Sequence, residues 1–253
     1  MRNVRLQIEY DGTDFQGWQR QLDRPTIQAF IEDNLAEVLG RRTVIYGASR
    51  TDSGVHARGQ VANFYTDGKI TPAQWRSVLN FRLPKTIRIL ESSEMPLAFH
   101  AQRDALDKVY EYRILNRPVS SALDRRVLFY PKPLDWAAMR ATLPHFVGTK
   151  DFRSFQGAKA ERKTTVRTIH SFDLFEDAPG LYRFRICGSG FLKQMVRTIV
   201  GTLLEVGEGK RTIDSIPAVI ASGQRQKAGR TISAYGLCLV EIRYPEFSWW
   251  RPA

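Results

Sequence analysis

The 253-residue chain has little of what metal, redox and membrane proteins need. Its two cysteines and four histidines are scattered, without the short spacings that ligate zinc, and glycine-rich nucleotide-binding loops are missing. No apolar run approaches the roughly 20 residues that span a membrane, and the N-terminus lacks an apolar signal segment. We therefore expect a cytoplasmic protein with no metal and no cofactor, whose cysteines, Cys187 and Cys238, are reduced and lie in the core.

Acidic residues are scarce relative to basic ones. The chain has 38 Lys and Arg against 26 Asp and Glu, a net charge of +12. Residues 1–106 carry 14 basic and 12 acidic residues, a net of +2, whereas residues 107–253 carry 24 and 14, a net of +10. A phosphate backbone is the natural partner for such an excess, although a generally basic surface gives the same count.

Apolar periodicity predicts the order strand, helix, strand, strand, helix, strand twice along the chain. We therefore predict an α+β protein made of two tandem ferredoxin-like βαββαβ halves, residues 1–106 and 107–253, with antiparallel sheets side by side and a basic cleft between them. The strands expected are Val4–Tyr10, Thr43–Tyr46, Gln60–Thr66 and Ile87–Leu90, then Val109–Leu115, Val166–Phe175, Leu181–Cys187 and Leu237–Tyr244. We expect three helices that begin after Thr26, Thr71 and Asp135. A fourth, long helix is expected at Phe191–Val206, and a shorter one near Ser215–Ala221.

Two basic segments interrupt the second half. The stretch 148–165 reads as a long irregular loop, and such a loop inside a compact domain is usually functional or disordered. A second loop, QRQKAGR, spans 224–230. We expect RNA phosphates to contact both loops, with a solvated surface as the alternative; the candidate residues are Lys159, Arg162, Lys163 and Arg230.

Residues 47–60, GASRTDSGVHARGQ, place Arg50, Asp52 and His56 in one loop between two strand-like runs. Glycine on both flanks lets the backbone turn sharply, and a loop carried by strands often displays a reactive group. Taken alone, the stretch fits a surface turn in which Asp52 makes a local hydrogen bond. We interpret His56 as a structural hydrogen-bonding residue, because no serine or cysteine nucleophile accompanies it.

The second half offers an arginine and two tyrosines. On the helix expected at 191–206, Arg197 falls opposite the apolar side, with Gly201 one turn further on; an ordinary exposed arginine is the alternative. Tyr110 and Tyr112 share one face of their strand. They can stack a nucleobase or serve as ordinary sheet aromatics.

Several motifs together resemble the TruA-type tRNA pseudouridine synthases. Residues 49–57, SRTDSGVHA, look like the signature of that family, with Ser49 and Ser53 where glycine and alanine are usual. The resemblance covers nearly the whole chain, and its further motifs follow in order: Tyr10-Asp11-Gly12-Thr13, Leu83-Pro84, Phe99-His100-Ala101, Lys108-Val109-Tyr110-Glu111-Tyr112, Asp151-Phe152, Gly190-Phe191-Leu192 and Gly236-Leu237.

The resemblance implies a homodimeric enzyme, without cofactor or metal, that isomerises uridine to pseudouridine at positions 38, 39 and 40 of the tRNA anticodon stem-loop. It implies that Asp52 is the nucleophile and that Tyr110 stacks on the base. It further implies that Arg197 is the active-site arginine and that Leu237 is an apolar wall residue. Arg50 would either fill the place that the flipped-out nucleotide leaves or hold its phosphate.

The chemistry is consistent with these roles. The reaction breaks the bond between ribose C1′ and uracil N1 and rejoins the base through C5. Asp52 must be ionised to act as a nucleophile, and a nearby guanidinium favours the charged form; attack on C6 or on C1′ both stay open. The alternative function is a non-catalytic RNA-binding or RNA-folding protein of the same fold. Departures from the family pattern at Lys193-Gln194 and at residues 232–235 leave their contacts open.

Overall fold

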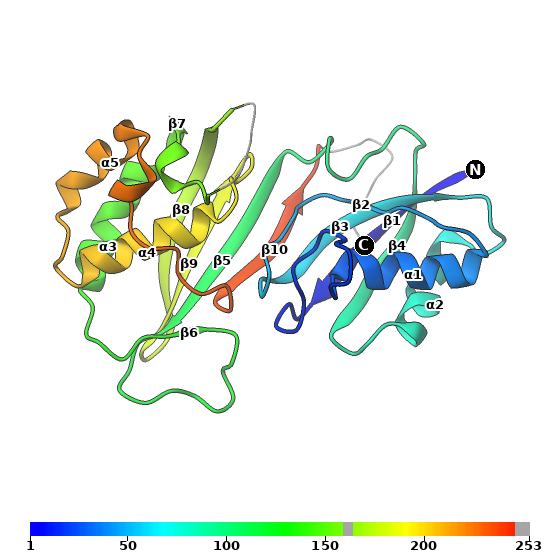
Figure 1. Ribbon diagram of the computed structural model, residues 1–253, viewed down its shortest axis with the longest axis horizontal. Helices are drawn as coiled ribbons and strands as arrows, with labels where there is room; N and C mark the ends of the chain where they lie inside the picture. The colour runs from blue at the N-terminus through cyan, green and yellow to red at the C-terminus, as the bar shows by residue number, and fades with distance from the viewer. Residues whose placement is uncertain (159–163, 246–253) are drawn as a thin grey trace. The chain divides into compact units, whose positions relative to one another are not determined.

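The computed structural model describes residues 1–158 and 164–245, which form two compact units (Figure 1). The first unit contains Met1–Lys108 and the chain from Leu239 onward, and the second contains Val109–Cys238. We had expected the second half to run to the end of the chain. The last strand belongs mostly to the first unit because it pairs with β3 there, so closely that a Cβ on Gly59 would lie 2.3 Å from the Val240 carbonyl oxygen.

The first unit has an antiparallel sheet in which β1 pairs with both β3 and β4, and β2 pairs with β3. Helix α1 contacts α2, and α2 packs on the sheet through Trp75, whose ring centroid lies 5.2 Å from that of Phe64. β2 is shorter than the strand expected at 43–46. The elements are β1 (Arg2–Tyr10), α1 (Ile27–Leu39), β2 (Tyr46–Gly47), β3 (His56–Thr66), the 3-10 turn η1 (Pro72–Gln74), α2 (Trp75–Arg82), β4 (Ile87–Met95) and the later strand β10 (Leu237–Arg243).

The helices of this unit begin and end where their sequences predict. The hydroxyl of Thr26 accepts a hydrogen bond from the Ala29 amide at 3.3 Å and caps α1. Gly40 ends this helix in the left-handed conformation, with φ of 67°. Thr71 and Gln74 form a capping box around Pro72 and lead into α2.

The first part of strand β1, residues 3–6, is buried on both faces, although its alternating sequence predicts burial on one face. Val4 has no exposed surface, as expected, but Asn3 has none either and Arg5 is 6% exposed. The reason is that the chain after β4 covers the second face. The side-chain Nδ2 of Asn3 donates to the backbone carbonyl oxygens of Pro96 and Phe99 at 2.9 and 2.8 Å. Sequence alternation could not show this covering, because the contact is made by residues about 90 positions away.

The second unit packs helices on a sheet in which β9 lies between β5 and β8. Trp136 of α3 stacks on Tyr182 of β9 with ring centroids 3.6 Å apart. Among the described residues, no helix is both long and apolar enough to cross a membrane. The elements are β5 (Asp107–Leu115), β6 (Leu128–Phe129), α3 (Trp136–Thr142), η2 (Leu143–Phe146), β7 (Gly148–Asp151), η3 (Arg153–Phe155), β8 (Val166–Ala178), β9 (Leu181–Gly188), α4 (Met195–Gly207), η4 (Ile213–Ser215), α5 (Ile216–Ser222) and η5 (Arg225–Lys227).

Helix α4 starts later than its apolar pattern predicts. We expected it from Phe191, but it begins at Met195 because Gln194 has a left-handed backbone with φ of 60°, which a right-handed helix cannot include. Residues 188–190, GSG, therefore lie before the N-terminus of α4 and not at it.

The stretch 148–165 is more ordered at its ends than we expected. Its first residues form β7, which pairs antiparallel with β8. Phe152 and Phe155 have no exposed surface, and the Phe152 amide donates to the carbonyl oxygen of Thr165 at 3.1 Å. Two large buried aromatic side chains account for this order, since burying each stabilises the segment by about 2–3 kcal/mol.

Substitution of Asn63 tests the covering of the second sheet face. Asn63 is fully buried. Its side-chain Nδ2 donates to Asn3 Oδ1, and its side-chain Oδ1 accepts from the Ala101 backbone amide, both at 2.9 Å. Asn63→Ala leaves two buried polar groups without this partner, and we expect it to lower the free energy of unfolding by about 2–4 kcal/mol in urea titrations. Asn34→Ala is the control, at a half-buried site on α1 where the side chain makes a solvent-exposed hydrogen bond to the Phe30 carbonyl oxygen; it should change the free energy of unfolding by less than about 0.5 kcal/mol. Equal values for the two variants would contradict the account.

Candidate functional site

Asp52 lies on the connection between β2 and β3, residues 48–55, which we call the aspartate loop. A second connection, residues 11–20 after β1, packs against it and is called the opening loop. The hydroxyls of Tyr10 and Thr51 are hydrogen-bonded at 2.7 Å in a buried position. The Trp18 amide donates to the Thr51 carbonyl oxygen at 3.1 Å. The residue directly before Asp52 is thus held by both its side chain and its backbone.

Glycines bring the two loops into backbone contact. A Cβ on Gly12 would lie 2.0 Å from the Val55 carbonyl oxygen, and one on Gly17, where φ is +86°, would lie 2.6 Å from that of Thr51. Any side chain at either position must therefore separate the loops. The sequence directed attention to the glycines of residues 47–60, but Gly12 and Gly17 of the opening loop are the ones that let the two loops touch.

Hydrogen bonds three residues before Asp52 and in the turn after it also fix the backbone of this loop. Gln60 of β3 clamps Ser49: the Ser49 amide donates to Gln60 Oε1 at 3.2 Å, and Gln60 Nε2 donates to the Ser49 carbonyl oxygen at 2.6 Å. The Val55 amide donates to the Asp52 carbonyl oxygen at 3.2 Å and closes a turn. Ser49 and Thr51 are buried, whereas Arg50 is exposed and Asp52 is half-buried. The loop therefore presents Arg50 and Asp52 from a buried frame.

His56 supports this frame. It is 4% exposed, its Nδ1 accepts a hydrogen bond from the Gly12 amide at 3.1 Å, and the same nitrogen lies 3.0 Å from Asp11 Oδ1. The histidine joins the start of β3 to the opening loop. These contacts agree with the structural role expected of it.

In the second unit, Tyr110 and Leu237 are buried, each 6% exposed. The Tyr110 ring meets Phe191 edge-on, with centroids 5.3 Å apart and planes at 85°. Arg197 is half-buried on α4, and its Nε donates to the carbonyl oxygen of Ile232 at 2.8 Å. The side chains of Tyr110 and Arg197 therefore have defined orientations set by neighbours in their own unit.

Residues 229–236 form a strap across α4 and β5. Tyr112 donates its hydroxyl hydrogen to the Ser233 carbonyl oxygen at 2.7 Å, and burial raises the pKa of this phenol while the Arg197 charge opposes the rise. A Cβ on Gly201 would lie 2.0 Å from the Arg230 carbonyl oxygen. The helix face around Gly201 is thus covered by the strap. Sequence reasoning assigned Arg230 of the strap to phosphate contact but did not predict this covering, although Gly229 and Gly236 mark close approaches.

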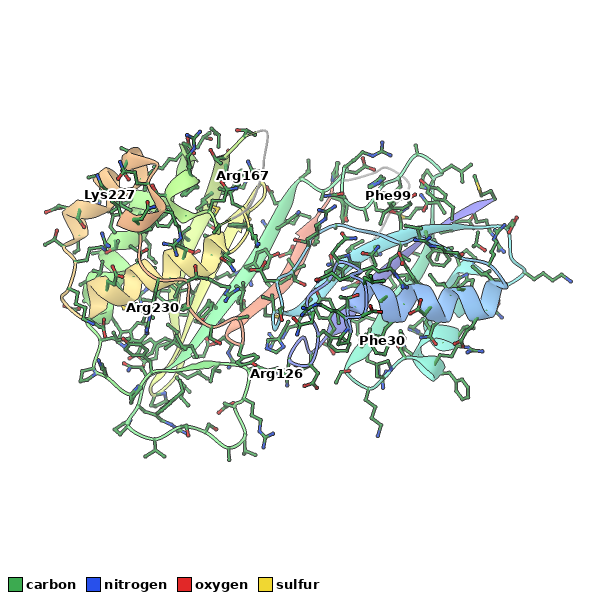
Figure 2. The ribbon with its side chains drawn as sticks, in the orientation of Figure 1. Phe30, Phe99, Arg126, Arg167, Lys227 and Arg230 are labelled. Carbon is green, nitrogen blue, oxygen red and sulfur yellow. The ribbon has the colours of Figure 1, made fainter. Side chains whose placement is uncertain are left out.

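The predicted phosphate contacts are only partly within the described structure. Lys159, Arg162 and Lys163 lie outside the described residues. Arg230 is exposed, as is Lys227 (Figure 2). Arg225 of the same loop has a structural role instead, because its guanidinium donates to the Gly229 carbonyl oxygen and the Thr231 hydroxyl, both at 2.9 Å.

The described residues contain no group of three or more His, Cys, Asp or Glu side chains placed to hold a metal ion. The candidate side chains are a carboxylate with an exposed guanidinium in the first unit and, described separately, a tyrosine, a guanidinium and a leucine in the second. Such groups can supply a nucleophile, a stacking surface and charge stabilisation.

Comparisons with known proteins agree on one family. The family model described as tRNA pseudouridine synthase matches residues 7–103 and 143–245. The chain is 45% identical to tRNA pseudouridine synthase A of Geobacter sp. (strain M21) over 97% of this chain and all of that protein. It is 46% identical to tRNA pseudouridine synthase A of Acetivibrio thermocellus over 96% of this chain, again matching all of the relative.

Removal of the Tyr10 hydroxyl should loosen the aspartate loop specifically. Tyr10→Phe deletes the 2.7 Å bond to Thr51, and Tyr244→Phe is a matched control, because it deletes a 2.7 Å bond to the Ala101 carbonyl oxygen in the same unit. Both variants should lose about 1 kcal/mol of global stability. Hydrogen exchange of the Gly54 and Val55 amides should accelerate about fivefold more in Tyr10→Phe. Similar exchange at these amides in the two variants would show that the bond does not hold the loop.

Proposed function

This chain belongs to the tRNA pseudouridine synthase A family, and we propose that it isomerises uridine at positions 38, 39 and 40 of the tRNA anticodon stem-loop. The family makes it a tRNA pseudouridine synthase, an isomerase. The observation that supports an aspartate mechanism is the rigid presentation of Asp52, which is half-buried and directly follows a loop segment clamped at Ser49 and Thr51.

In the proposed mechanism, the carboxylate of Asp52 is the nucleophile. The bond between ribose C1′ and uracil N1 breaks, the base turns, and a bond forms between C1′ and C5. The bond that Asp52 forms with the substrate breaks again, the proton on C5 leaves and N1 gains one, so the carboxylate is regenerated and the product is an isomer of the substrate. A freed base must stay in place during this turn, and a loop with little freedom around the nucleophile serves that need, because small displacements at a reacting centre cost rate.

We propose that Tyr110, Arg197 and Leu237 act on the same uridine as Asp52. Arg197 donates through Nε to the Ile232 carbonyl oxygen, and this bond sets the plane of its guanidinium. The guanidinium charge would favour the ionised form of the Asp52 carboxylate and pair with it. Tyr110 provides a ring for stacking, and Leu237 an apolar wall. Arg50 is exposed beside Asp52 and is proposed to replace the flipped nucleotide or hold its phosphate, offsetting an unstacking cost of a few kcal/mol.

We further propose that each unit is a ferredoxin-like βαββαβ fold. The pairing of β1 with β3 and β4, and of β2 with β3, supports this for the first unit. A homodimer acting on tRNA in the cytoplasm completes the proposal, with residues Lys159, Arg162, Lys163 and Arg230 contacting RNA phosphates.

Neutralising Asp52 tests the nucleophile. Asp52→Asn keeps the size of the side chain but removes its charge, so it should bind tRNA nearly as the unchanged enzyme does and form no pseudouridine in digested, chromatographed nucleosides. Asp23→Asn removes a charge from an exposed left-handed position that asparagine tolerates, and it should keep full activity. Turnover by Asp52→Asn would remove Asp52 as the nucleophile.

Salt dependence tests the phosphate contacts. Replacing Lys159, Arg162 and Lys163 with alanine should flatten the slope of log K against log salt by about 0.7–0.9 for each phosphate that is no longer neutralised. The control replaces three exposed cations of the first unit, Lys69, Arg76 and Lys85, and removes the same charge. An identical slope in the two triple variants would show that the 159–163 segment makes no specific phosphate contact.

A further inference from the structure

Three aromatic rings gather around Tyr46 of β2, the strand that leads into the aspartate loop. The ring of Tyr46, in β2, lies 5.0 Å from that of His100 and 6.3 Å from that of Tyr65, centroid to centroid. Tyr46 nevertheless remains 40% exposed. We call these three residues the aromatic cluster. Two neighbouring rings limit the motion of Tyr46, so an exposed π-surface is fixed before any ligand arrives.

The backbone that carries Tyr46 is fixed as firmly as its ring. β2 pairs Tyr46 with Asn63 and Gly47 with Ala62. Gly47 lies so close to the Trp18 ring that a Cβ there would be 2.4 Å from it. Trp18 also holds the aspartate loop through its amide, and Asp52 follows only six positions after Tyr46. The aromatic cluster and the proposed nucleophile therefore share one rigid support.

His100 contributes a neutral ring to this cluster. Its Nδ1 accepts hydrogen bonds from the amides of Gln102 and Arg103, at 3.2 and 3.4 Å. Burial, followed by the charge of Arg103, lowers the pKa of the imidazole, while Asp104 accepts a bond from the His100 backbone amide. With Nδ1 accepting, the ring proton lies on Nε2, which is a donor. Arg103 itself is exposed.

We propose that Tyr46, supported by His100 and Tyr65, stacks an unpaired nucleobase of the substrate RNA other than the uridine that reacts. This rests on the proposed function, since it assigns a second base contact to the same tRNA substrate. Bases in RNA loops are typically bound by stacking on aromatic side chains beside hydrogen-bond donors and arginine. Stacking also suits the first half of the chain, which has a net charge of only +2 over residues 1–106 and so attracts phosphates weakly.

A second copy of this chain is the competing occupant of the cluster. A stable protein interface buries roughly 800 Å² on each partner around an apolar centre. Tyr46 is the most exposed of the three rings, and the charge of Arg103 is close enough to lower the pKa of His100; this combination matches a base and its phosphate better than an apolar protein surface. RNA is therefore the occupant that the chemistry favours.

The test compares Tyr46→Ala, Tyr46→Phe and Phe81→Ala. Phe81 is 92% exposed on α2 of the same unit, so its loss controls for removing an exposed aromatic ring. The dissociation constant of a tRNA anticodon stem-loop is measured over a range of salt concentrations. Tyr46→Ala should weaken binding about 5- to 150-fold with an unchanged salt slope, because stacking releases no counterions. Tyr46→Phe, which keeps the ring, and Phe81→Ala should bind as the unchanged protein does.

Other outcomes separate the ways in which this proposal can fail. Unchanged affinity in Tyr46→Ala overturns the stacking role. A weaker affinity accompanied by a lower oligomeric state in sedimentation also overturns it and assigns the cluster to contact between copies. Pseudouridine formation at saturating RNA is followed in parallel: if the unchanged protein forms none, the proposed function fails, whereas activity with unaltered binding in Tyr46→Ala defeats only this inference.

Discussion

The contact between the opening loop and the aspartate loop is the constraint on which the candidate site depends. Gly12 and Gly17 let two backbones touch, and the buried bond between Tyr10 and Thr51 locks them together. Gln60 holds the same loop three residues before Asp52, through Ser49. A carboxylate on a free surface turn samples many positions and loses rate accordingly. Here the conformational entropy is already lost on folding, so Asp52 is presented in one position.

In the second unit, hydrogen bonds to a backbone segment also fix the candidate residues. The strap of residues 229–236 accepts hydrogen bonds from Arg197 and Tyr112 through two adjacent carbonyl oxygens, those of Ile232 and Ser233. These bonds couple the direction of an arginine on α4 to the chain that leads into Leu237. In both units, a backbone segment with no chemistry of its own orients the side chains that carry the proposed chemistry.

Much of this could be predicted from the sequence, within clear physical limits. Caps such as Thr26 and Gly40 act within one turn of helix, so α1 was predicted with its ends. The motif around Asp52 indicated the family, which the comparisons confirm. Two contacts between distant segments could not be predicted: the covering of Asn3 by the chain after β4, and the strap over Gly201. The left-handed backbone of Gln194, after which α4 begins, could not be predicted either. Each depends on tertiary packing that periodicity does not encode.

The central claim is that the Asp52 carboxylate attacks the substrate, and trapping that attack tests it most directly. A stem-loop RNA with 5-fluorouridine at the target position cannot lose a proton from C5, so the reaction should stall after the nucleophile has engaged. The protein is then digested and the RNA-linked peptide identified by mass spectrometry. The account predicts a covalent link on Asp52 that is lost in Asp52→Asn. A link on any other side chain, or one that persists in that variant, would contradict it.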